Sequence, residues 1–337
     1  MLRLGLQFDL RAPAGGPSTT DLYAAAVDQC AWADGLGFET VYIGEHHGAE
    51  DGYCPSPIVV GAAIASRTSR IAIHLSALIA VLHNPLRLAE DLAVLDILSN
   101  GRLVLTLGIG YRPHEYAMFG VSKAERAAIL ESTIEVLDRA WTGEAFDHQG
   151  VRVLVRPTPA RRPRPPIYIG GSLRASALRA ARYGDNYLPA GDATLFEVYR
   201  QERERLGLPV GEPPPVRGPM FVHVTRDPEA DWPVIGPAVL YAANSYADWA
   251  TERGGGGGSY TRTADLDALR RNPSYRLVTP AECVEMAETL GDGGELIFQP
   301  LFGGIEPERA WRSLRLFESA VLPELETRGL RPARSGD

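Results

Sequence analysis

Along this sequence, short apolar segments typical of strands alternate repeatedly with longer segments typical of helices, and this alternation limits the possible folds. The strand-like segments are rich in β-branched residues or alternate in polarity, and most are followed by apolar residues at the helical spacing. Because each helix returns the chain to the start of the next strand, this alternation predicts a parallel sheet covered by helices. Eight such strands are predicted, at residues 4–8, 40–44, 71–75, 102–110, 167–169, 186–188, 220–224 and 295–301.

The number of strands favours a closed architecture. Eight parallel strands that alternate with helices most simply form a (β/α)8 TIM barrel, and 337 residues suit one such domain with insertions, spanning 1–337. A doubly wound open sheet is the competing α/β fold, and it would usually carry G-x-G-x-x-G after the first strand. The sequence APAGGP, which follows Leu10 and Arg11, lacks that spacing, so the barrel is the predicted fold.

Two stretches depart from the regular rhythm and are predicted to be insertions. Residues 143–165 combine a hairpin pattern around HQG with the proline-rich connector RPTPARRPRPP. Residues 245–278 contain the run GGGGGS, in which the glycines at 254–258 carry large chain entropy and no packing side chains. This second insertion is either a mobile lid over the mouth of the barrel or a flexible surface linker.

Charge and composition argue against several classes of protein. The net charge is −8 and the 34 Lys and Arg residues are scattered, so we expect no nucleic-acid-binding surface. The longest apolar run, IAIHLSALIAVL, is too short to cross a bilayer, so we expect no membrane span. The N-terminal MLRLGLQFDL lacks signal-peptide features, and the 3 cysteines form no C-x-x-C pair, so a cytoplasmic location is expected.

The segment TVYIGEHHGAED is the strongest candidate for chemistry, because Glu45, His46 and His47 directly follow a predicted strand. In a (β/α)8 barrel, the C-terminal ends of the strands build the active site. Neighbouring residues on a strand point to opposite faces, so the two histidines are not expected to hold one metal ion, and no metal is predicted. The alternative is that the triplet forms a hydrogen-bonded rim without a catalytic role.

Three segments, taken in order, resemble the bacterial luciferase-like flavin-dependent monooxygenases. They are YIGEHH, HNPLRLAEDLAVLDILSNGRLVLTLGIGY and PPIYIGGS. The resemblance covers residues 4–188 well and the remainder only through the rhythm of strands and helices. It implies a (β/α)8 barrel that binds reduced flavin at the C-terminal ends of its strands. His46 matches the family histidine that supports the oxygen chemistry, and Glu45 and His47 would orient it or line the site.

The resemblance also implies which backbone lies against the flavin ring. The third strand ends at LSALIAV, where the family packs backbone beneath the flavin, commonly with a cis peptide bond. The matching bond joins Ser76 and Ala77. The fourth strand ends at GIGY, so Gly108, Gly110 and Tyr111 are expected close to the flavin, since glycine permits close backbone approach.

The flavin phosphate is expected on two other segments. Luciferase carries a phosphate-contacting arginine where this chain has Ile109, and this departure leaves the phosphate arrangement open. Arg126 matches another family arginine that reaches the phosphate. Gly170, Gly171 and Ser172 lie between a strand and a helix, where backbone N–H groups and a hydroxyl can bind a phosphate at a helix N-terminus.

Fewer residues are candidates for the substrate pocket. Phe8 ends the first predicted strand, and His114 and Glu115 lie in the loop after the fourth, where family members often place polar contacts. The alternative for the His114–Glu115 pair is a position on the surface. His83 is expected near the mouth of the barrel or as the cap of a turn.

The reaction implied by the resemblance is a monooxygenation. Reduced FMN, delivered by a separate flavin reductase, would react with O2 to give a C4a-peroxyflavin in a pocket that excludes water. One oxygen atom would then pass to a small organic substrate, with His46 assisting proton transfer. The resemblance further implies a homodimer that forms through the helices near strands two and three.

Two other functions remain open on the same residues. The superfamily also contains F420-dependent oxidoreductases that transfer a hydride, and the Glu-His-His triplet suits that cofactor as well. A barrel that binds flavin without catalysis is the second alternative; the absence of the strand-end histidine would favour it, and His46 is present. Aldehydes, aromatic polyketide-like compounds and carrier-bound acyl groups all remain candidate substrates.

Overall fold

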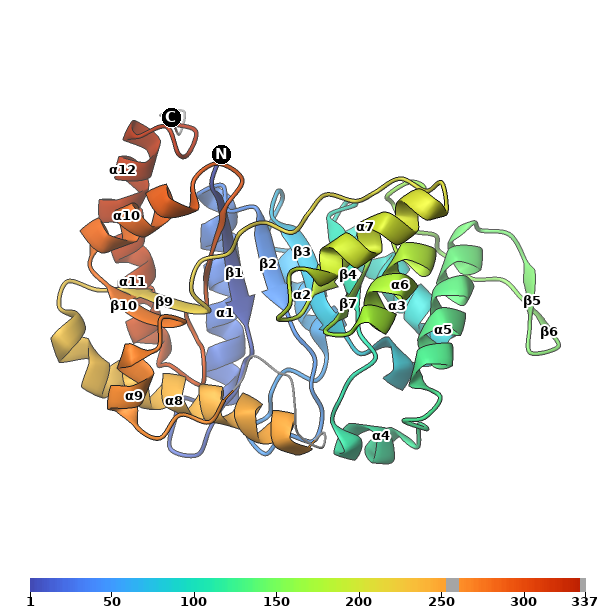
Figure 1. Cartoon of the computed structure of the whole chain (residues 1–337), viewed down its shortest axis with the longest axis horizontal. Helices are drawn as coiled ribbons and strands as arrows, with labels where there is room; N and C mark the ends of the chain where they lie inside the picture. Colours follow the sequence, from blue (N-terminus) through green and yellow to red (C-terminus); the bar gives the residue numbers. More distant parts are fainter. Residues whose placement is uncertain (253–260, 334–337) are drawn as a thin grey trace.

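The structure is a computed structural model that describes residues 1–252 and 261–333. Its centre is a curled sheet of seven parallel strands in the order β11-β1-β2-β3-β4-β7-β8, with helices packed around it (Figure 1). The protein therefore has an α/β fold. The strands of this sheet are β1 (Arg3–Phe8), β2 (Thr40–Ile43), β3 (Ala72–Leu78), β4 (Leu103–Leu107), β7 (Ile167–Gly171), β8 (Asn186–Pro189) and β11 (Glu295–Phe298).

A second, two-stranded parallel sheet consists of β9 (Phe221–Val224) and β10 (Tyr275–Val278). The seventh strand predicted from the sequence is β9, whereas β10 is not among the predicted strands. Arg217, just before β9, forms a parallel bridge with Glu295 of β11. Within the described residues no ladder joins β8 to β9, and the ladder of β9 is with β10. The sheet is thus a curled half-barrel with this pair beside it, and the closed eight-stranded barrel remains a prediction.

The helices alternate with the strands largely as predicted. They are α1 (Thr19–Gly35), α2 (Pro57–Ala65), α3 (Pro85–Leu98), α4 (Pro113–Phe119), α5 (Arg126–Trp141), α6 (Arg174–Tyr183), α7 (Leu195–Arg205), α8 (Pro228–Glu252), α9 (Leu266–Arg271), α10 (Pro280–Leu290), α11 (Pro307–Leu316) and α12 (Leu322–Thr327), with the short turns η1 (Ala80–Leu82) and η2 (Phe317–Val321). The side chain of Ser18 caps α1, and Asn84 caps α3 ahead of Pro85. Helices α4, α8, α9 and α10 are not among the predicted elements.

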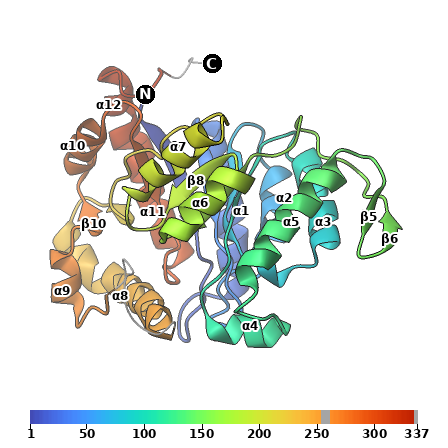
Figure 2. The same ribbon diagram turned by 45° about the vertical axis from the view of Figure 1, so that its right-hand side comes forward.

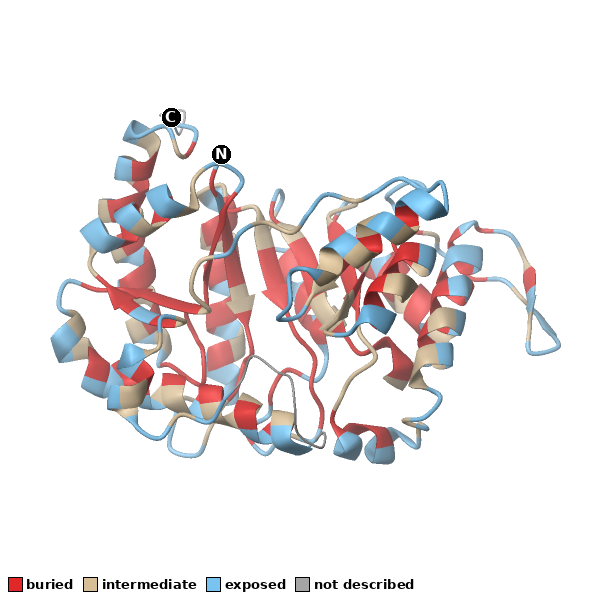
Figure 3. Ribbon diagram, in the orientation of Figure 1, coloured by how far each residue is buried: buried red, intermediate tan, exposed pale blue. Residues whose placement is uncertain are grey.

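The strands of the main sheet run parallel, so their C-terminal ends lie at the same edge of the sheet. Phe8 of β1 is in register with Ile43 of β2, and Ile43 is in register with Leu75 of β3. The strands carry much of the buried core (Figure 3), and their C-terminal ends face α4 and the end of α8, at the bottom of Figures 1 and 2. Residues that directly follow the strands therefore meet at this edge.

The two predicted insertions differ in form. Within residues 143–165, β5 (Phe146–His148) pairs antiparallel with β6 (Val151–Val153) across a turn in which Gln149 and Gly150 have φ of 50° and 78°. Two positive φ values are those of a type I′ hairpin turn, and this hairpin projects away from the body (Figure 2). Within residues 245–278, the described part forms the end of α8, then α9 and β10, and the glycines at 254–258 lie outside the described residues. Neither α8 nor any other described helix is long and apolar enough to span a membrane.

Candidate active site

Glu45, His46 and His47 directly follow β2 and are buried at the C-terminal edge of the sheet. The two histidines have different carboxylate partners. Nδ1 of His46 lies 2.8 Å from Oε1 of Glu115, whereas Nε2 of His47 lies 3.0 Å from Oε1 of Glu45. The backbone N–H of His47 also donates to Oε1 of Glu115, at 3.0 Å. The part of the chain that the structure describes contains no cluster of three His, Cys, Asp or Glu side chains suited to a metal ion.

The surroundings of His46 favour a neutral imidazole. Burial lowers the pKa of His46, and the hydrogen bond with Glu115 opposes this effect only in part. Because a carboxylate cannot donate, Nδ1 of the neutral ring carries the hydrogen and Nε2 is left as the acceptor. The Tyr111 hydroxyl lies 3.4 Å from that Nε2. His46 therefore has the arrangement of a general base that a carboxylate orients.

Glu45 anchors two further histidines. Its Oε1 lies 3.0 Å from Nε2 of His47 and 2.7 Å from Nε2 of His83, and its Oε2 accepts the backbone N–H of Ile79. Burial by itself would raise the pKa of Glu45, but these hydrogen bonds lower it to about 2. Burial lowers the pKa of His83, yet the bond to Glu45 outweighs that effect and the net shift is upward. Glu45 thus ties the end of β2 to the segment that follows β3.

A cluster of arginine and aromatic side chains, absent from the predicted site, packs against His46. Arg11 is 1% exposed, and its guanidinium carbon lies 4.2 Å from the ring centroid of Trp249 and 4.8 Å from that of Tyr53. The guanidinium carbon of Arg112 also lies 4.2 Å from the Trp249 ring. The Trp249 and His46 ring centroids are 4.6 Å apart. This cluster surrounds the candidate base with apolar ring surface.

The sequence position of Asp9 and Arg11 could have identified them as candidates for the site. Asp9 and Arg11 come immediately after the first strand, which is where barrel side chains enter an active site. Tyr246 and Trp249 lie near the end of α8, in a segment without any recognisable motif. They reach the site only because α8 crosses the C-terminal edge of the sheet (Figure 1).

The residues predicted to lie beside the flavin ring line the ends of β3 and β4, and Gly170, predicted to contact the flavin phosphate, lies at the end of β7. The peptide bond between Ser76 and Ala77 is cis. A Cβ atom on Gly108 would lie 3.3 Å from Cβ of Ala77, and one on Gly170 would lie 3.0 Å from Cγ2 of Thr106. Glycine at these positions leaves backbone exposed at the strand ends, so a planar ring can approach it closely. The residues present therefore fit a flavin.

Gly110 and Tyr111 extend this surface toward His46. Gly110 has a φ of +69°, and a Cβ atom there would lie 2.9 Å from the Ile79 side chain, so both its conformation and its surroundings require glycine. Tyr111 is half-buried, and its ring centroid lies 5.4 Å from that of His46. The two predicted groups, histidine base and strand-end glycines, are therefore adjacent.

The predicted phosphate-binding residues lie on two separate elements. Gly171 ends β7 and Ser172 precedes α6; a Cβ atom on Gly171 would come within 2.4 Å of the Ser176 side chain, so the turn requires glycine. Arg126 begins α5, is half-buried and donates to the carbonyl oxygen of Lys123. The turn before α6 therefore offers the N-terminus of a helix, and Arg126 is the cation available one helix earlier.

The three predicted substrate-pocket residues have different surroundings. Phe8 is buried in the core at the end of β1. His114 and Glu115 both lie in the first turn of α4, but Glu115 is buried against His46, whereas His114 is exposed beside Gly48. Of the three, Glu115 is the residue that hydrogen-bonds to the Glu-His-His segment.

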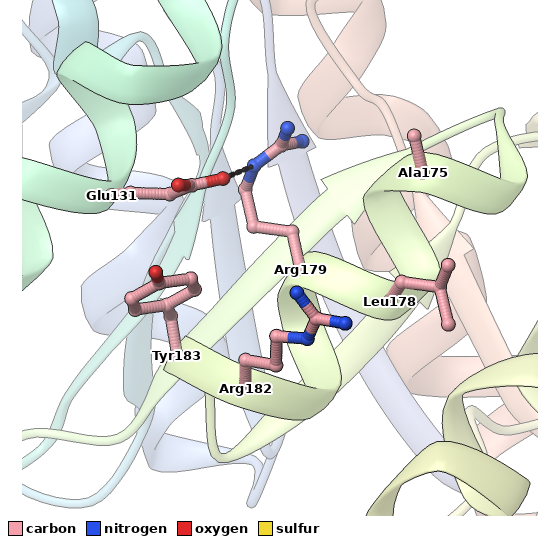
Figure 4. Close-up of a pocket in the computed structure, with 6 residues that line it drawn as sticks. All are labelled: Glu131, Ala175, Leu178, Arg179, Arg182 and Tyr183. Carbon is pink, nitrogen blue, oxygen red and sulfur yellow. Dashed lines mark hydrogen bonds and ion pairs between the residues drawn. The ribbon is translucent and has the colours of Figure 1, made fainter.

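A surface pocket of about 220 Å³ lies elsewhere, between α5 and α6 (Figure 4). Nε of Arg179 donates to Glu131 within it, at 2.8 Å. None of its residues belongs to the predicted site. The pocket is lined by Glu131, Ala175, Leu178, Arg179, Arg182 and Tyr183.

Comparison with models of known protein families assigns the chain to a family. Residues 5–297 match the model of the luciferase-like monooxygenase family, so the chain belongs to that family. The resemblance drawn from YIGEHH, the GIGY segment and PPIYIGGS is thereby confirmed.

Three curated relatives illustrate the similarity. An uncharacterised protein, y4vJ of Sinorhizobium fredii, is 30% identical over 174 residues, which is 50% of each chain. The oxygenase component of a flavin-dependent trigonelline monooxygenase from Acinetobacter baylyi is 26% identical over 50% of this chain and 48% of the relative. A 4-hydroxyprotoasukamycin monooxygenase from Streptomyces nodosus subsp. asukaensis is 28% identical over 45% and 43%. The chain matches about half the length of these relatives.

Solved structures share the fold over nearly the whole chain. The monooxygenase RslO1 from Streptomyces bottropensis has a TM-score of 0.73 and 24% identity, and covers 96% of this chain and 99% of its own. The oxygenating constituent of 3,6-diketocamphane monooxygenase from Pseudomonas putida, in complex with FMN, has a TM-score of 0.74 and 19% identity over 96% and 98%. An F420-dependent secondary alcohol dehydrogenase has a TM-score of 0.63 and 16% identity over 91% and 97%.

Proposed function

We propose that the protein is a flavin-dependent monooxygenase that uses reduced FMN and O2 to oxygenate a small organic substrate. The observation that carries this proposal is the buried His46–Glu115 pair, whose acceptor Nε2 faces Tyr111 beside glycine-lined strand ends. A neutral imidazole that a carboxylate orients can accept a proton and return it near neutral pH. The names of the trigonelline and 4-hydroxyprotoasukamycin relatives, both monooxygenases, support the same reaction class.

The residues predicted to act in catalysis or to bind the cofactor have the following roles in this proposal. His46 moves the proton through Nε2, and Glu115 fixes its tautomer and orientation. Glu45 and His47 are positioning residues, since Glu45 joins the segment after β2 to the segment after β3. The strand ends that would hold the ring are Ser76, Ala77, Gly108, Gly110 and Tyr111, and the residues that would hold the phosphate are Gly170, Gly171, Ser172 and Arg126.

The cofactor would supply the redox chemistry. FMN, when bound in its reduced form, would supply the chemistry that activates O2, and a separate flavin reductase would deliver it. The chain's own part is to exclude water from the reacting atoms. Tyr53, Tyr246 and Trp249 do so in this proposal, because their rings cover the side of His46 that faces α8.

F420-dependent hydride transfer is the second candidate function. The F420-dependent alcohol dehydrogenase shares the fold, and a deazaflavin ring is as flat as that of FMN. FMN is favoured because the trigonelline relative is named as flavin-dependent and the diketocamphane enzyme was solved with FMN. A barrel that binds flavin without catalysis is the remaining alternative.

The deciding experiment is an anaerobic titration of the purified chain with reduced FMN and, separately, with reduced F420, followed by rapid mixing with O2. Tight binding of reduced FMN and a reoxidation much slower than that of free flavin would support the monooxygenase. Tight binding of reduced F420, without reaction of the bound cofactor with O2, would instead support the hydride-transfer enzyme. Binding of FMN without any substrate-coupled turnover would leave the non-catalytic barrel.

We also propose that the protein forms a homodimer through α2 and α3. Both helices expose large apolar side chains, among them Val59 at 69%, Leu98 at 53% and Val94 at 43%. Apolar side chains gathered in this way are typical of subunit interfaces. Light scattering should give twice the mass of one chain, and Val59→Glu combined with Leu98→Glu should give a single chain mass. A monomeric unmodified protein would contradict the proposal.

A further inference from the structure

One edge of the Arg11 guanidinium, deep in the site, has no hydrogen-bond partner within the described residues. The side chain is 1% exposed, and its Nη1 donates to Oδ2 of Asp51 at 2.5 Å. Within the described residues, Nε and Nη2 are buried and have no hydrogen-bond partner. Buried donors are almost always paired in folded proteins, so this edge is unusual and points to a ligand.

The two donors that lack a hydrogen-bond partner in the described part of the chain, Nε–H and Nη2–H, lie on the same edge of the guanidinium. Nε–H and one Nη2–H point in the same direction from the planar guanidinium, and this fork matches the two oxygens of a carboxylate. Asp9 does not fill the position. Its Oδ2 lies 3.5 Å from Nε and instead accepts the backbone N–H of Gly303 at 3.1 Å, while its Oδ1 accepts the N–H of Arg11. The carboxylate beside Nε is therefore turned toward the backbone.

The free edge lies beside the candidate base. The Arg11 guanidinium carbon is 4.2 Å from the Trp249 ring centroid and 4.9 Å from that of Tyr246. Trp249 is 4.6 Å from His46, and Tyr53 is 4.9 Å from His46. A molecule held at this edge of Arg11 would therefore have its carbon skeleton beside the rings that contact His46.

Charged groups of both signs surround this edge. Two cations, Arg11 and Arg112, contact Trp249, and Arg112 is paired with Glu252 at 3.2 Å and lies 3.8 Å from Glu115. Asp51 is already bound to Arg11 and accepts the Tyr241 hydroxyl at 2.9 Å. Burial is the largest effect on Asp9 and raises its pKa to about 6, so its carboxylate becomes protonated as the pH falls through 6.

We propose that Arg11 determines the substrate class: its Nε and Nη2 bind the carboxylate of an organic acid whose carbon skeleton lies against Trp249 and His46. This inference rests on the proposed function, because it assigns the substrate of that same site. The carboxylate lies in the plane of the guanidinium at this edge, and Tyr246 on the last turns of α8 is the ring that moves to admit the carbon skeleton. Neutral analogues of the acid lack the two charged oxygens and bind weakly.

The test is equilibrium binding to the full chain, measured by calorimetry and by tryptophan fluorescence with and without bound FMN. The probes are two matched pairs, benzoate with benzamide and hexanoate with hexanamide. We expect each acid to bind at least about tenfold more tightly than its amide, as a hydrogen-bonded charge pair would require. Equal binding of acid and amide in both pairs would overturn the proposal.

Three variants separate recognition from architecture. Arg11→Met removes the donors while filling the volume, and Arg11→Lys keeps the buried charge beside Asp51 but loses the forked edge. Both should lose the preference for the acid. Arg139→Met, which removes an arginine that stacks on Phe146 at 4.6 Å on the outer layer, should keep it. A folded Arg11→Lys protein that retains the full preference would contradict the proposal, as would unchanged acid binding by a folded Arg11→Met protein.

The same measurements distinguish this inference from the proposed function. Acid-selective binding that depends on Arg11, in a chain that fails to bind reduced flavin, would support the recognition site and contradict the monooxygenase. Flavin binding with slow reoxidation but without acid selectivity would support the monooxygenase and contradict the recognition site. In a turnover assay with an accepted acid, Arg11→Lys should raise KM with little change in kcat, since the residue binds the end of the substrate remote from the reacting carbon.

Discussion

Nδ1 of His46 lies 2.8 Å from Oε1 of Glu115, although 69 residues separate the two in the chain. This contact joins the end of β2 to the first turn of α4 and leaves Nε2 of the imidazole as the acceptor. It makes His46 the best-placed base of the candidate site, and the first two predictions depend on it.

Replacing His46 by alanine should lower substrate oxygenation by about 10²- to 10⁴-fold, the usual contribution of a positioned general acid or base. Binding of reduced flavin should persist, because the glycine-lined strand ends are untouched. Product analysis and an anaerobic flavin titration measure the two effects separately. His114→Ala, which alters an exposed histidine of the neighbouring helix, is the matched control and should keep full activity. Equal turnover in both variants would remove His46 from the mechanism.

Glu115→Gln should shift the titration of His46 to lower pH. Burial already lowers the pKa of His46, and the carboxylate of Glu115 opposes that shift, so a neutral amide removes the opposing effect. The His46 ring resonance in NMR spectra, assigned with the His46→Ala protein, reports the pKa directly. If the proton transfer uses this imidazole, the acid limb of the activity profile should move in the same direction. A pKa that rises would mean that Glu115 acts on His46 in some other way.

Glu45→Gln should destabilise the protein in a pH-dependent manner. The pKa of Glu45 is lowered from 4.5 to about 2 in the folded state, so its contribution is present above about pH 4.5 and is lost as the pH falls toward 2. At pH 7 this contribution is on the order of 3 kcal/mol. Denaturant unfolding at several pH values should show a large difference from the unmodified chain at pH 7 that shrinks below pH 4.5. Glu50→Gln, at an exposed position, should show no such trend.

Gly108→Ala should weaken the binding of reduced FMN by about tenfold or more, as expected when an added methyl group holds a stacked ring away from its surface. The new Cβ atom would lie 3.3 Å from Cβ of Ala77, on the strand-end surface that the ring is proposed to cover. Gly35→Ala is the control, because nothing lies within 4 Å of a Cβ atom at that position at the end of α1. Flavin titrations of the two variants should differ, and identical affinities would place the flavin elsewhere.

Several elements of the fold follow from local sequence alone. Alternating strands and helices recur because each apolar run must be buried against a helix, and this pattern located the strands of the main sheet. The strand-end rule then placed Glu45, His46 and His47 at the edge where α4 and α8 lie. The family resemblance pointed to the Ser76–Ala77 bond, which is cis in the structure. These features depend on residues close together in the chain.

Other features depend on contacts between segments far apart in the chain. The ladder of β9 with β10, the bond between His83 and Glu45 and the packing of Trp249 against Arg11 carry no local signature. His114 and Glu115 are neighbours on one helical turn, yet one is exposed and the other buried against His46. From the sequence alone we could predict the α/β class, the positions along the chain of the strands of the main sheet, and the location of His46 and His47 at a strand end. These features follow from local periodicity and from the geometry of parallel strands. Which carboxylate holds each histidine, and which aromatic rings enclose Arg11, was decided by the tertiary structure, since burial and electrostatic pairing depend on distance in space.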